Sequence, residues 1–357
     1  MTQYGVLAAS SRTRAFQYLP YFEKNGVECQ MLTVLPDIAG SQLLVTSQAW
    51  RKLLYYSRAT WRTVLCGLRA YFYAGQVDVV LIQKVILPRW LRWLVGRLKT
   101  PLVYDFDDAI FTSEVRRQNW LAAWKERRNS TGVPAMLQLC KLAIVENDYN
   151  AEFAARYCPL VAQITGPIDT DHYRPGPERR RREIVIGWIG SASTLPYLEL
   201  IREPLKQLAQ RFPDVRLSIV GAEQIAMEGI ETVTKAWNID SEVEDLQEFD
   251  IGLMPMPDDP WTRGKGGYKL LQYMATGLPV LTSPVGVNQQ IVEDGRHGFW
   301  ARTSAEWLTC LERLVADGDL RRRMGLQGRQ RVEEVYALKV QQVRLWQLLQ
   351  DLIGERK

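Results

Sequence analysis

Short runs of apolar and β-branched residues alternate with amphipathic stretches along nearly the whole chain. Strands separated by helix-length segments form parallel sheets, because a parallel connection needs a crossover of that length. One helical pattern begins at Ser10 and Ser11, which we expect to cap it, and continues to about Lys24; another opens at Pro88. In the first half the apolar runs lie at residues 4–9, 27–34, 77–82, 101–106, 142–147 and 160–165. This alternation predicts an α/β fold with doubly wound parallel sheets.

A polar segment at residues 166–183 interrupts the alternation with three prolines, two glycines and four consecutive arginines, and we interpret it as an interdomain linker. After it, apolar runs resume at 183–190, 215–221, 231–235, 250–255, 278–283 and 298–301. Helical patterns lie at about 193–211, 241–249, 267–276, 304–316, 318–334 and 337–353. The 357 residues suffice for two domains of ordinary size. We therefore predict a first Rossmann-like domain over 1–165 and a second over 184–335, followed by a C-terminal helix over 336–357.

Several classes of protein are excluded or disfavoured by missing motifs. The five cysteines lie far apart without a Cys-x-x-Cys pair, which argues against a zinc ribbon and a disulfide scaffold. Two histidines are few for a hydrolase with a catalytic histidine, and neither a Gly-x-Gly-x-x-Gly motif after the first strand nor a P-loop is present. The N-terminus lacks a signal-peptide pattern, and no apolar run approaches the ~18 residues of a membrane span. We expect a cytoplasmic protein.

The net charge of +5 is unevenly distributed, because residues 50–99 hold ten basic residues against the single acid Asp78. Nine aromatic residues are interleaved there. A basic, aromatic helical surface is suited to an anionic membrane leaflet, and our leading interpretation is a peripheral protein at the inner face of the plasma membrane. One alternative is that half of these aromatic residues are core and the cations form a solvated rim; the other, which we disfavour, is nucleic-acid binding. The aromatic residues include Trp50, Tyr55, Tyr56, Trp61, Trp90 and Trp93.

Residues 250–290 carry the strongest signal for ligand chemistry. A strand that ends at Pro255 is followed by a polar loop, and Gly264–Gly267 then lead into a helix whose free N–H groups favour an anion. Lys265, Lys269 and Gln272 are spaced so that a continuing helix places them on one face. We predict a diphosphate site at the two lysines, with Gln272 on ribose hydroxyls. The alternative is a surface helix with two solvated lysines.

Two segments of the first domain follow predicted strands and carry charge. Arg12 and Arg14 lie at a helix start after the first strand and are suited to phosphate, unless they are ordinary surface arginines. Asp105, Asp107 and Asp108 end another strand, where three acids repel one another without a ligand. They are candidates for binding acceptor hydroxyls, for a catalytic base or, least favoured, for a divalent metal. The alternative is a solvated acidic turn that caps the next helix.

The segment KGGYKLLQYMATGLPVLTS (265–283) strongly resembles the donor-site motif of GT-B glycosyltransferases, in the superfamily of retaining enzymes that build bacterial polysaccharides and lipid-linked glycans. Segments 163–175, 184–191, 215–223 and 242–255 resemble further parts of that family in the expected order. The resemblance covers nearly all of residues 160–300 and is weaker before them. It implies two Rossmann-like domains facing a cleft, with the C-terminal helix crossing back to the first.

The sequence also departs from the family pattern. The Glu-x7-Glu motif of such enzymes aligns with Gly264 and Gln272, so its first carboxylate is missing unless Asp258 or Asp259 replaces it. The basic residues that often follow the first donor-domain strand are replaced by Gly190, Ser191 and Ser193. The donor site implied by the resemblance therefore comprises Gly190, Ser191, Trp237, Lys265, Gly266, Lys269 and Gln272, with Arg12 from the first domain; the implied catalytic residues are Asp107, Asp108 and Lys269.

The resemblance implies an enzyme that moves a sugar from a nucleotide diphosphate, UDP or GDP, to a hydroxyl of a lipid-linked or polysaccharide acceptor. It implies retention of configuration and no metal or other cofactor. Two alternatives stay open at this point. The loss of the first glutamate favours a degenerate, non-catalytic scaffold, and a nucleotide-sugar epimerase uses the same fold.

Overall fold

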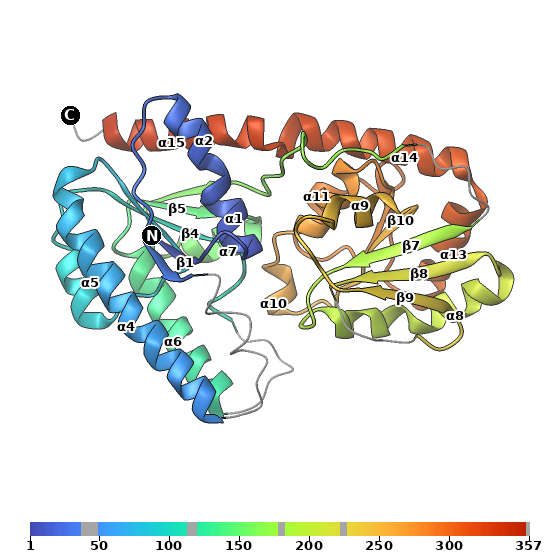
Figure 1. Ribbon diagram of the computed structural model, residues 1–357, viewed down its shortest axis with the longest axis horizontal. Coiled ribbons are helices and arrows are strands. Elements are labelled where there is room, and N and C mark those ends of the chain that lie inside the picture. Colours follow the sequence, from blue (N-terminus) through green and yellow to red (C-terminus); the bar gives the residue numbers. More distant parts are fainter. Residues whose placement is uncertain (37–48, 113–119, 178–182, 222–226, 355–357) are drawn as a thin grey trace. The chain divides into compact units, whose positions relative to one another are not determined.

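The computed structural model describes residues 1–36, 49–112, 120–177, 183–221 and 227–354. The chain divides into two compact units, labelled by element in Figure 1. Unit 1 comprises Met1–Pro167, Gly264–Gly266 and Gln341–Lys357, and unit 2 comprises Ile168–Arg263 and Gly267–Val340. The four arginines of the predicted linker, at 179–182, lie outside the described residues.

Unit 1 is built on a six-stranded sheet whose neighbouring strands run parallel. Its order is β2-β1-β3-β4-β5-β6, so the direction of winding reverses between β1 and β3. In open sheets of this kind, ligands bind beyond the carboxyl ends of the strands at such a switch point. The strands are β1 (Thr2–Tyr4), β2 (Thr33–Leu35), β3 (Val80–Gln83), β4 (Leu102–Phe106), β5 (Leu142–Val145) and β6 (Leu160–Gln163).

Helices cover this sheet and complete the hydrophobic core of unit 1. They are α1 (Ala9–Arg14), α2 (Leu19–Lys24), α4 (Ala49–Tyr73), α5 (Arg89–Val95), α6 (Trp120–Leu137) and α7 (Asp148–Ala154). The last helix, α15 (Leu338–Gly354), belongs to unit 1 from Gln341 onward, and its Trp346 ring lies 6.0 Å from that of Phe22. None of the described helices has a stretch long and apolar enough to cross a bilayer.

The predicted start of unit 1 is wrong in two respects. The first strand occupies Thr2–Tyr4 rather than 4–9, because a turn from Gly5 to Ala8 follows it and leaves Val6 and Leu7 exposed. The predicted helix from Ser10 to Lys24 is broken by a 3-10 turn between α1 and α2. Nor do the serines cap α1, since its N-cap is Ala8 without a side-chain bond. Ser11 instead accepts a hydrogen bond from the Tyr4 backbone and donates one to Gln83.

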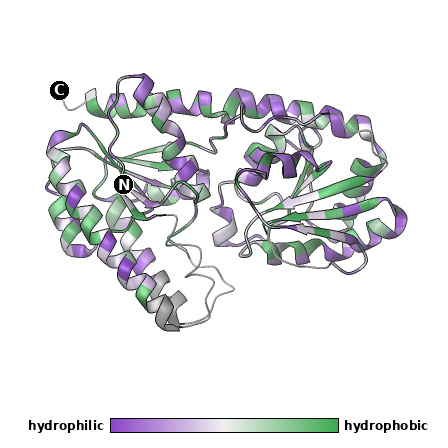
Figure 2. Cartoon of the chain, viewed as in Figure 1, coloured by the Kyte–Doolittle hydropathy of each residue, from purple (hydrophilic) through white to green (hydrophobic). Residues whose placement is uncertain are grey.

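Unit 2 is built on a second six-stranded sheet of parallel neighbours, in the order β12-β11-β10-β7-β8-β9. This is the dinucleotide-binding arrangement, with its switch point between β7 and β10. Both faces of β7 are buried, Val185 and Ile189 in one core and Ile186 and Trp188 in another, and β7 is correspondingly hydrophobic in Figure 2. The strands are β7 (Ile184–Ile189), β8 (Val215–Val220), β9 (Glu231–Lys235), β10 (Ile251–Met254), β11 (Val280–Thr282) and β12 (Gly298–Trp300).

The predicted helices of unit 2 are present in order, and the structure adds two four-residue helices, at Pro260–Arg263 and Asn288–Ile291, that were not predicted. The helices of unit 2 are the 3-10 helix η4 (Leu195–Ile201) and the α-helices α8 (Arg202–Arg211), α9 (Glu242–Gln247), α10 (Pro260–Arg263), α11 (Tyr268–Ala275), α12 (Asn288–Ile291), α13 (Ser304–Ala316) and α14 (Gly318–Arg331). Helix α13 has the predicted bounds, because Thr303 and Glu306 form a capping box at its start. The predicted fold class, two doubly wound parallel sheets with flanking helices, is confirmed.

Candidate functional site

The start of α11 decides which lysine belongs to unit 2. Gly267 precedes the helix with a φ of 70°, a left-handed conformation that glycine adopts without steric cost. Because the helix begins only at Tyr268, Lys265 lies before it and groups with unit 1, whereas Lys269 lies in its first turn. The prediction that Lys265, Lys269 and Gln272 share one helix face is therefore wrong for Lys265.

Lys269 lies against the chain just after β7. Its ammonium donates to the Thr194 hydroxyl at 3.1 Å and sits 4.1 Å from the centre of the Trp188 ring, a cation–π distance. A side chain at Gly190 would place its Cβ 2.3 Å from the Lys269 nitrogen, so only glycine permits this approach. The predicted residues Gly190 and Lys269 are thus brought together at the switch point of the sheet, between β7 and β10.

The residues between Gly190 and η4 carry exposed hydroxyl groups. Ser191 and Ser193 are exposed, and their oxygens lie 2.8 Å apart, while Thr194 is the N-cap of η4. The Thr194 hydroxyl donates to the Ser191 carbonyl at 3.2 Å, and one serine hydroxyl donates to the other, which leaves one serine proton for a phosphate oxygen to accept. The segment after β7 therefore places hydroxyl groups and a closely approaching backbone beside the Lys269 ammonium.

Gln272 faces the protein interior rather than an open surface. It is 4% exposed, and its amide donates to the carboxylate of Glu242 at 2.9 Å. The same carboxylate accepts from the Trp237 indole at 2.8 Å and from the Tyr173 hydroxyl at 2.6 Å. Sequence reasoning missed Glu242 and Tyr173, for which the only signal is their place in the 242–255 and 163–175 segments. The structure brings Trp237 and Gln272 together through Glu242, while their predicted contacts to base and ribose stay a prediction.

The two acids proposed to replace the missing glutamate are engaged within their own loop. Asp258 pairs with Arg263 at 2.6 Å, which lowers the pKa of its carboxyl group. Asp259 accepts a hydrogen bond from the Thr262 backbone at 2.8 Å and so caps the short helix α10. A contact from either of them to a sugar stays a prediction.

In unit 1, Arg14 is buried within a network of acids. Its guanidinium donates to both oxygens of Asp105, the shorter contact being 2.6 Å, and lies 3.3 Å from Glu146. Burial opposes the charge of Arg14, but the two carboxylates outweigh it and raise its pKa. The expectation that Arg14 is available for a phosphate is therefore wrong. Arg12 contacts the Leu7 carbonyl at 3.2 Å, and its predicted role stays untested.

Two lysines neutralise the remaining acids of the run after β4. Lys84 forms an ion pair with Asp107, and its ammonium lies 3.2 Å from one carboxylate oxygen of Asp108. The Lys265 ammonium lies 3.3 Å from the other oxygen of Asp108. Burial opposes the charge of Asp108, but Lys265 and Lys84 together lower its pKa. Mutual repulsion is thus offset by protein cations, which corrects the expectation that the run needs a ligand. The described residues contain no cluster of three or more His, Cys, Asp or Glu that could hold a metal ion.

The segment Gly264–Gly266 is fixed within unit 1 by α7 and the residues before it. The Asn147 amide donates to the Lys265 carbonyl at 2.9 Å, and the Asn150 amide donates to the Gly264 carbonyl at 3.0 Å. Gly266 has no room for a side chain, because its Cβ would lie 1.3 Å from a Glu146 oxygen. Glu146 and its neighbours were missed, although an acid and an amide at the end of a predicted strand are a usable signal. Gly266 and Lys265 therefore lie beside Asp108 and Glu146.

Comparison with known proteins finds a family match within unit 2. Residues 183–317 match the family model for glycosyl transferases, group 1. The matched segment includes β7, Gly190 and Lys269.

A curated relative and two solved structures agree with this family. The D-inositol 3-phosphate glycosyltransferase of Corynebacterium urealyticum is 25% identical over 212 residues, which cover 51% of this chain and 48% of that protein. The chain thus spans about half the length of this curated relative. Sucrose-phosphate synthase from Thermosynechococcus elongatus has a TM-score of 0.65 at 16% identity, over 83% of this chain and 79% of that one. Anabaena HepE in complex with UDP and glucose has a TM-score of 0.60 at 14% identity, over 94% and 89%. Both solved structures share the two-domain fold of this chain.

Proposed function

We propose that the chain transfers a sugar from a nucleotide diphosphate to an acceptor hydroxyl. The observation that supports it most is the position of Lys269, whose ammonium lies against Gly190 at the switch point of the group 1 domain. Parallel sheets of this order bind nucleotides at that point. UDP and GDP are the first donors to test, and the complex of HepE with UDP favours UDP.

Charge at this position matches the needs of the reaction. When the bond between the sugar and the diphosphate breaks, negative charge grows on the leaving phosphate. Lys269 and the hydroxyls of Ser191 and Ser193 are donors already in place, and preorganised donors lower the barrier of such a step. We therefore propose that these donor groups, without a metal, stabilise the negative charge on the leaving phosphate.

The pKa of Asp108 bears on which group takes the proton of the acceptor hydroxyl. In the transfer, the acceptor oxygen bonds to the anomeric carbon, the diphosphate leaves, and the acceptor proton needs a base. Asp108 is a weak base, because Lys265 and Lys84 lower its pKa despite its burial. We propose that the leaving phosphate takes the proton on the face from which it departs, which retains the configuration of the sugar. Asp107 is the alternative base if the enzyme inverts.

The acceptor proposal rests on the basic, aromatic surface of residues 50–99. Trp61 on α4 and Trp90 and Trp93 on α5 are 63%, 49% and 61% exposed, which is unusual for tryptophan. Tyr55 is buried, so part of the aromatic set is core as the alternative interpretation held, and the Trp50 side chain lies outside the described residues. We propose that the exposed rings contact a membrane surface that carries a lipid-linked or polysaccharide acceptor.

The first experiment measures UDP and GDP affinity by calorimetry for the wild-type chain and for Lys269→Ala, with EDTA and with magnesium. We expect the variant to bind the preferred diphosphate about 10- to 100-fold more weakly, the range of one charge-assisted hydrogen bond. Lys206→Ala is the matched control, since Lys206 pairs with Glu228 on the surface of the same unit. Equal affinity of wild type and Lys269→Ala would place the diphosphate elsewhere. Failure of the wild type to bind either nucleotide would favour the scaffold, and conversion of the donor without an acceptor would favour the epimerase.

A second experiment separates the two mechanisms. Asp107→Asn removes the alternative base and keeps its size, so under the retaining proposal UDP affinity and most of the turnover persist. Removal of a true general base costs about 10²- to 10⁴-fold in rate. A loss in that range with unchanged UDP affinity would make Asp107 the base, and the anomeric configuration of the product, read by NMR, would then be inverted.

A further inference from the structure

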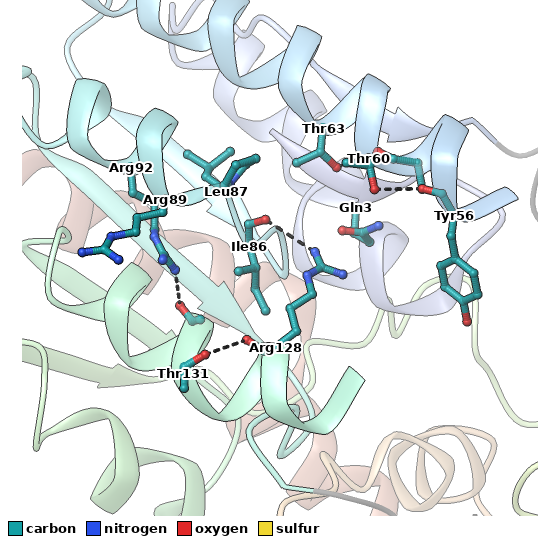
Figure 3. Close-up of a pocket in the computed structure, with 13 residues that line it drawn as sticks. Gln3, Tyr56, Thr60, Thr63, Ile86, Leu87, Arg89, Arg92, Arg128 and Thr131 are labelled. Carbon is teal, nitrogen blue, oxygen red and sulfur yellow. Dashed lines mark hydrogen bonds between the residues drawn. The ribbon is translucent and has the colours of Figure 1, made fainter. Parts of the chain in front are cut away.

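A cavity of about 320 Å³ lies in unit 1, apart from the acidic network (Figure 3). Its lining comes from β1, from the N-terminal half of α4, from the segment after β3 with α5, and from α6. Gln3 belongs to β1, and Ile86 and Leu87 follow β3, so the cavity adjoins the β1/β3 switch point of the sheet. This is the place where sheets of this class bind ligands.

The lining carries positive charge and no acid. Arg89 and Arg92 project from α5 and Arg128 from α6, on either side of Ile86 in Figure 3. None of the thirteen described residues that line the cavity is Asp or Glu. Arg89 and Arg128 are exposed and Arg92 is half-buried, so a ligand in the cavity reaches their guanidinium groups.

Arg89 and Arg92 are close enough to repel each other. Burial lowers the pKa of Arg92, and the neighbouring charge of Arg89 lowers it further. The Arg92 guanidinium donates to the Gly132 carbonyl at 3.5 Å, a long contact that uses one of its five N–H groups. An anion between these side chains would offset the repulsion and the desolvation together.

Three threonine hydroxyl groups also line the cavity. Thr60, Thr63 and Thr131 each donate their proton to a backbone carbonyl of their own helix, at 2.9, 2.8 and 2.9 Å. A hydroxyl whose proton is committed in this way offers its oxygen as an acceptor. The cavity therefore presents cations for an anionic group and acceptors for the hydroxyls of the molecule that carries it.

We propose that this cavity binds the phosphate group of a phosphorylated, hydroxyl-bearing acceptor, with Arg92 as its principal ligand and Arg89 and Arg128 beside it. A guanidinium holds a phosphate through two parallel N–H contacts, which suits this residue type to the task. The acceptor role rests on the proposed transferase function, whereas phosphate binding in the cavity is measurable without it. Such a phosphate has two sources, a soluble polyol phosphate or a lipid headgroup.

Two binding assays with the full chain distinguish these sources. Calorimetry with glycerol 3-phosphate probes the soluble source, with glycerol as the control ligand. Co-sedimentation with phosphatidylcholine vesicles that contain phosphatidic acid probes the lipid source, with pure phosphatidylcholine as the control. The variants are Arg92→Gln, the exposed Arg89→Gln, and the matched control Arg156→Gln, which loses the same charge at an exposed position just after α7, outside the cavity.

We expect the wild type to bind at least one phosphate probe, and Arg92→Gln to bind it at least about tenfold more weakly, with a smaller loss for Arg89→Gln and little change for Arg156→Gln. A response to glycerol 3-phosphate identifies a soluble source, and a response to the vesicles alone identifies a lipid source. Absence of binding to both probes, or equal losses for Arg92→Gln and Arg156→Gln, overturns the proposal. UDP affinity, measured on the same samples, reports on the transferase function separately.

Discussion

The carboxyl ends of the two sheets carry opposite kinds of chemistry. In unit 1 the strand ends are occupied by buried ion pairs, in which Arg14 pairs with Asp105 in β4 and Lys84 pairs with Asp107 just after that strand. In unit 2 the corresponding position after β7 holds a lysine against a glycine, an aromatic ring and hydroxyls. The same class of sheet therefore supports a charge network that fixes unit 1 and a cationic position suited to an anionic ligand in unit 2.

The largest expected effect tests whether the unit 1 network is structural. Arg14→Met leaves the carboxylate of Asp105 buried without its cation. We expect it to lower the free energy of unfolding by about 3–5 kcal/mol, the cost of breaking a buried pair from one side, measured by urea denaturation. Arg12→Gln in the same helix is the control, with little change expected. A loss below about 1 kcal/mol for Arg14→Met would show that the network contributes little to stability.

The next prediction tests the close approach in unit 2. Gly190→Ala places a methyl group 2.3 Å from the Lys269 nitrogen and 2.6 Å from the ring of the buried Trp188. Overpacking of this kind costs about 1–3 kcal/mol of stability, and displacement of Lys269 should weaken UDP binding about tenfold. Gly318→Ala is the matched control, because the nearest atom to its Cβ lies 3.6 Å away. Unchanged UDP affinity in a folded Gly190→Ala variant would contradict the proposed diphosphate position.

The next prediction concerns how the stability of unit 1 depends on pH through Glu146. Burial, with help from the neighbouring aspartates and against Arg14, raises the pKa of Glu146 well above its ordinary value of 4.5. The unfolded chain therefore loses this proton near pH 4.5 while the folded chain keeps it to higher pH. Each pH unit across that window lowers stability by about 1.4 kcal/mol relative to a chain that does not titrate there.

Glu146→Gln removes this titration. We expect its unfolding free energy to exceed that of the wild type by a margin that grows as the pH rises above 4.5, in urea denaturation at a series of pH values. The control is Glu152→Gln, which changes an exposed acid on α7 of the same unit. A difference between Glu146→Gln and wild type that stays constant with pH would contradict the assignment.

The smallest expected effect concerns the loop before α10. Asp258 and Arg263 form an exposed ion pair, and such pairs contribute little because water already solvates both charges. Asp258→Asn should change stability by less than about 0.5 kcal/mol in urea denaturation. A clear loss of sugar transfer with unchanged UDP affinity would restore Asp258 as the replacement for the missing glutamate. Equal turnover of the variant and the wild type would remove it from the mechanism.

Local patterns predicted most of the fold. The run at 231–235 and the helix at 304–316 have their predicted bounds, because β-branched content and a capping box act through neighbouring residues. The first strand was misplaced because Val6 and Leu7, though apolar, are exposed in a turn. Lys265 was wrongly placed on the face of α11, because the left-handed φ of Gly267, which separates it from the helix, does not appear in helical spacing.

The sequence by itself determined two parallel α/β sheets, the restart of the pattern after residues 166–183, and the segment around Lys269. Only the tertiary structure decided the partners of the charged residues. Arg14, Asp105 and Glu146 lie far apart in the chain, yet they meet because adjacent parallel strands end at the same edge of the sheet. The sequence shows each charge, but burial and distance decide whether it is neutralised within the protein or presented to a ligand.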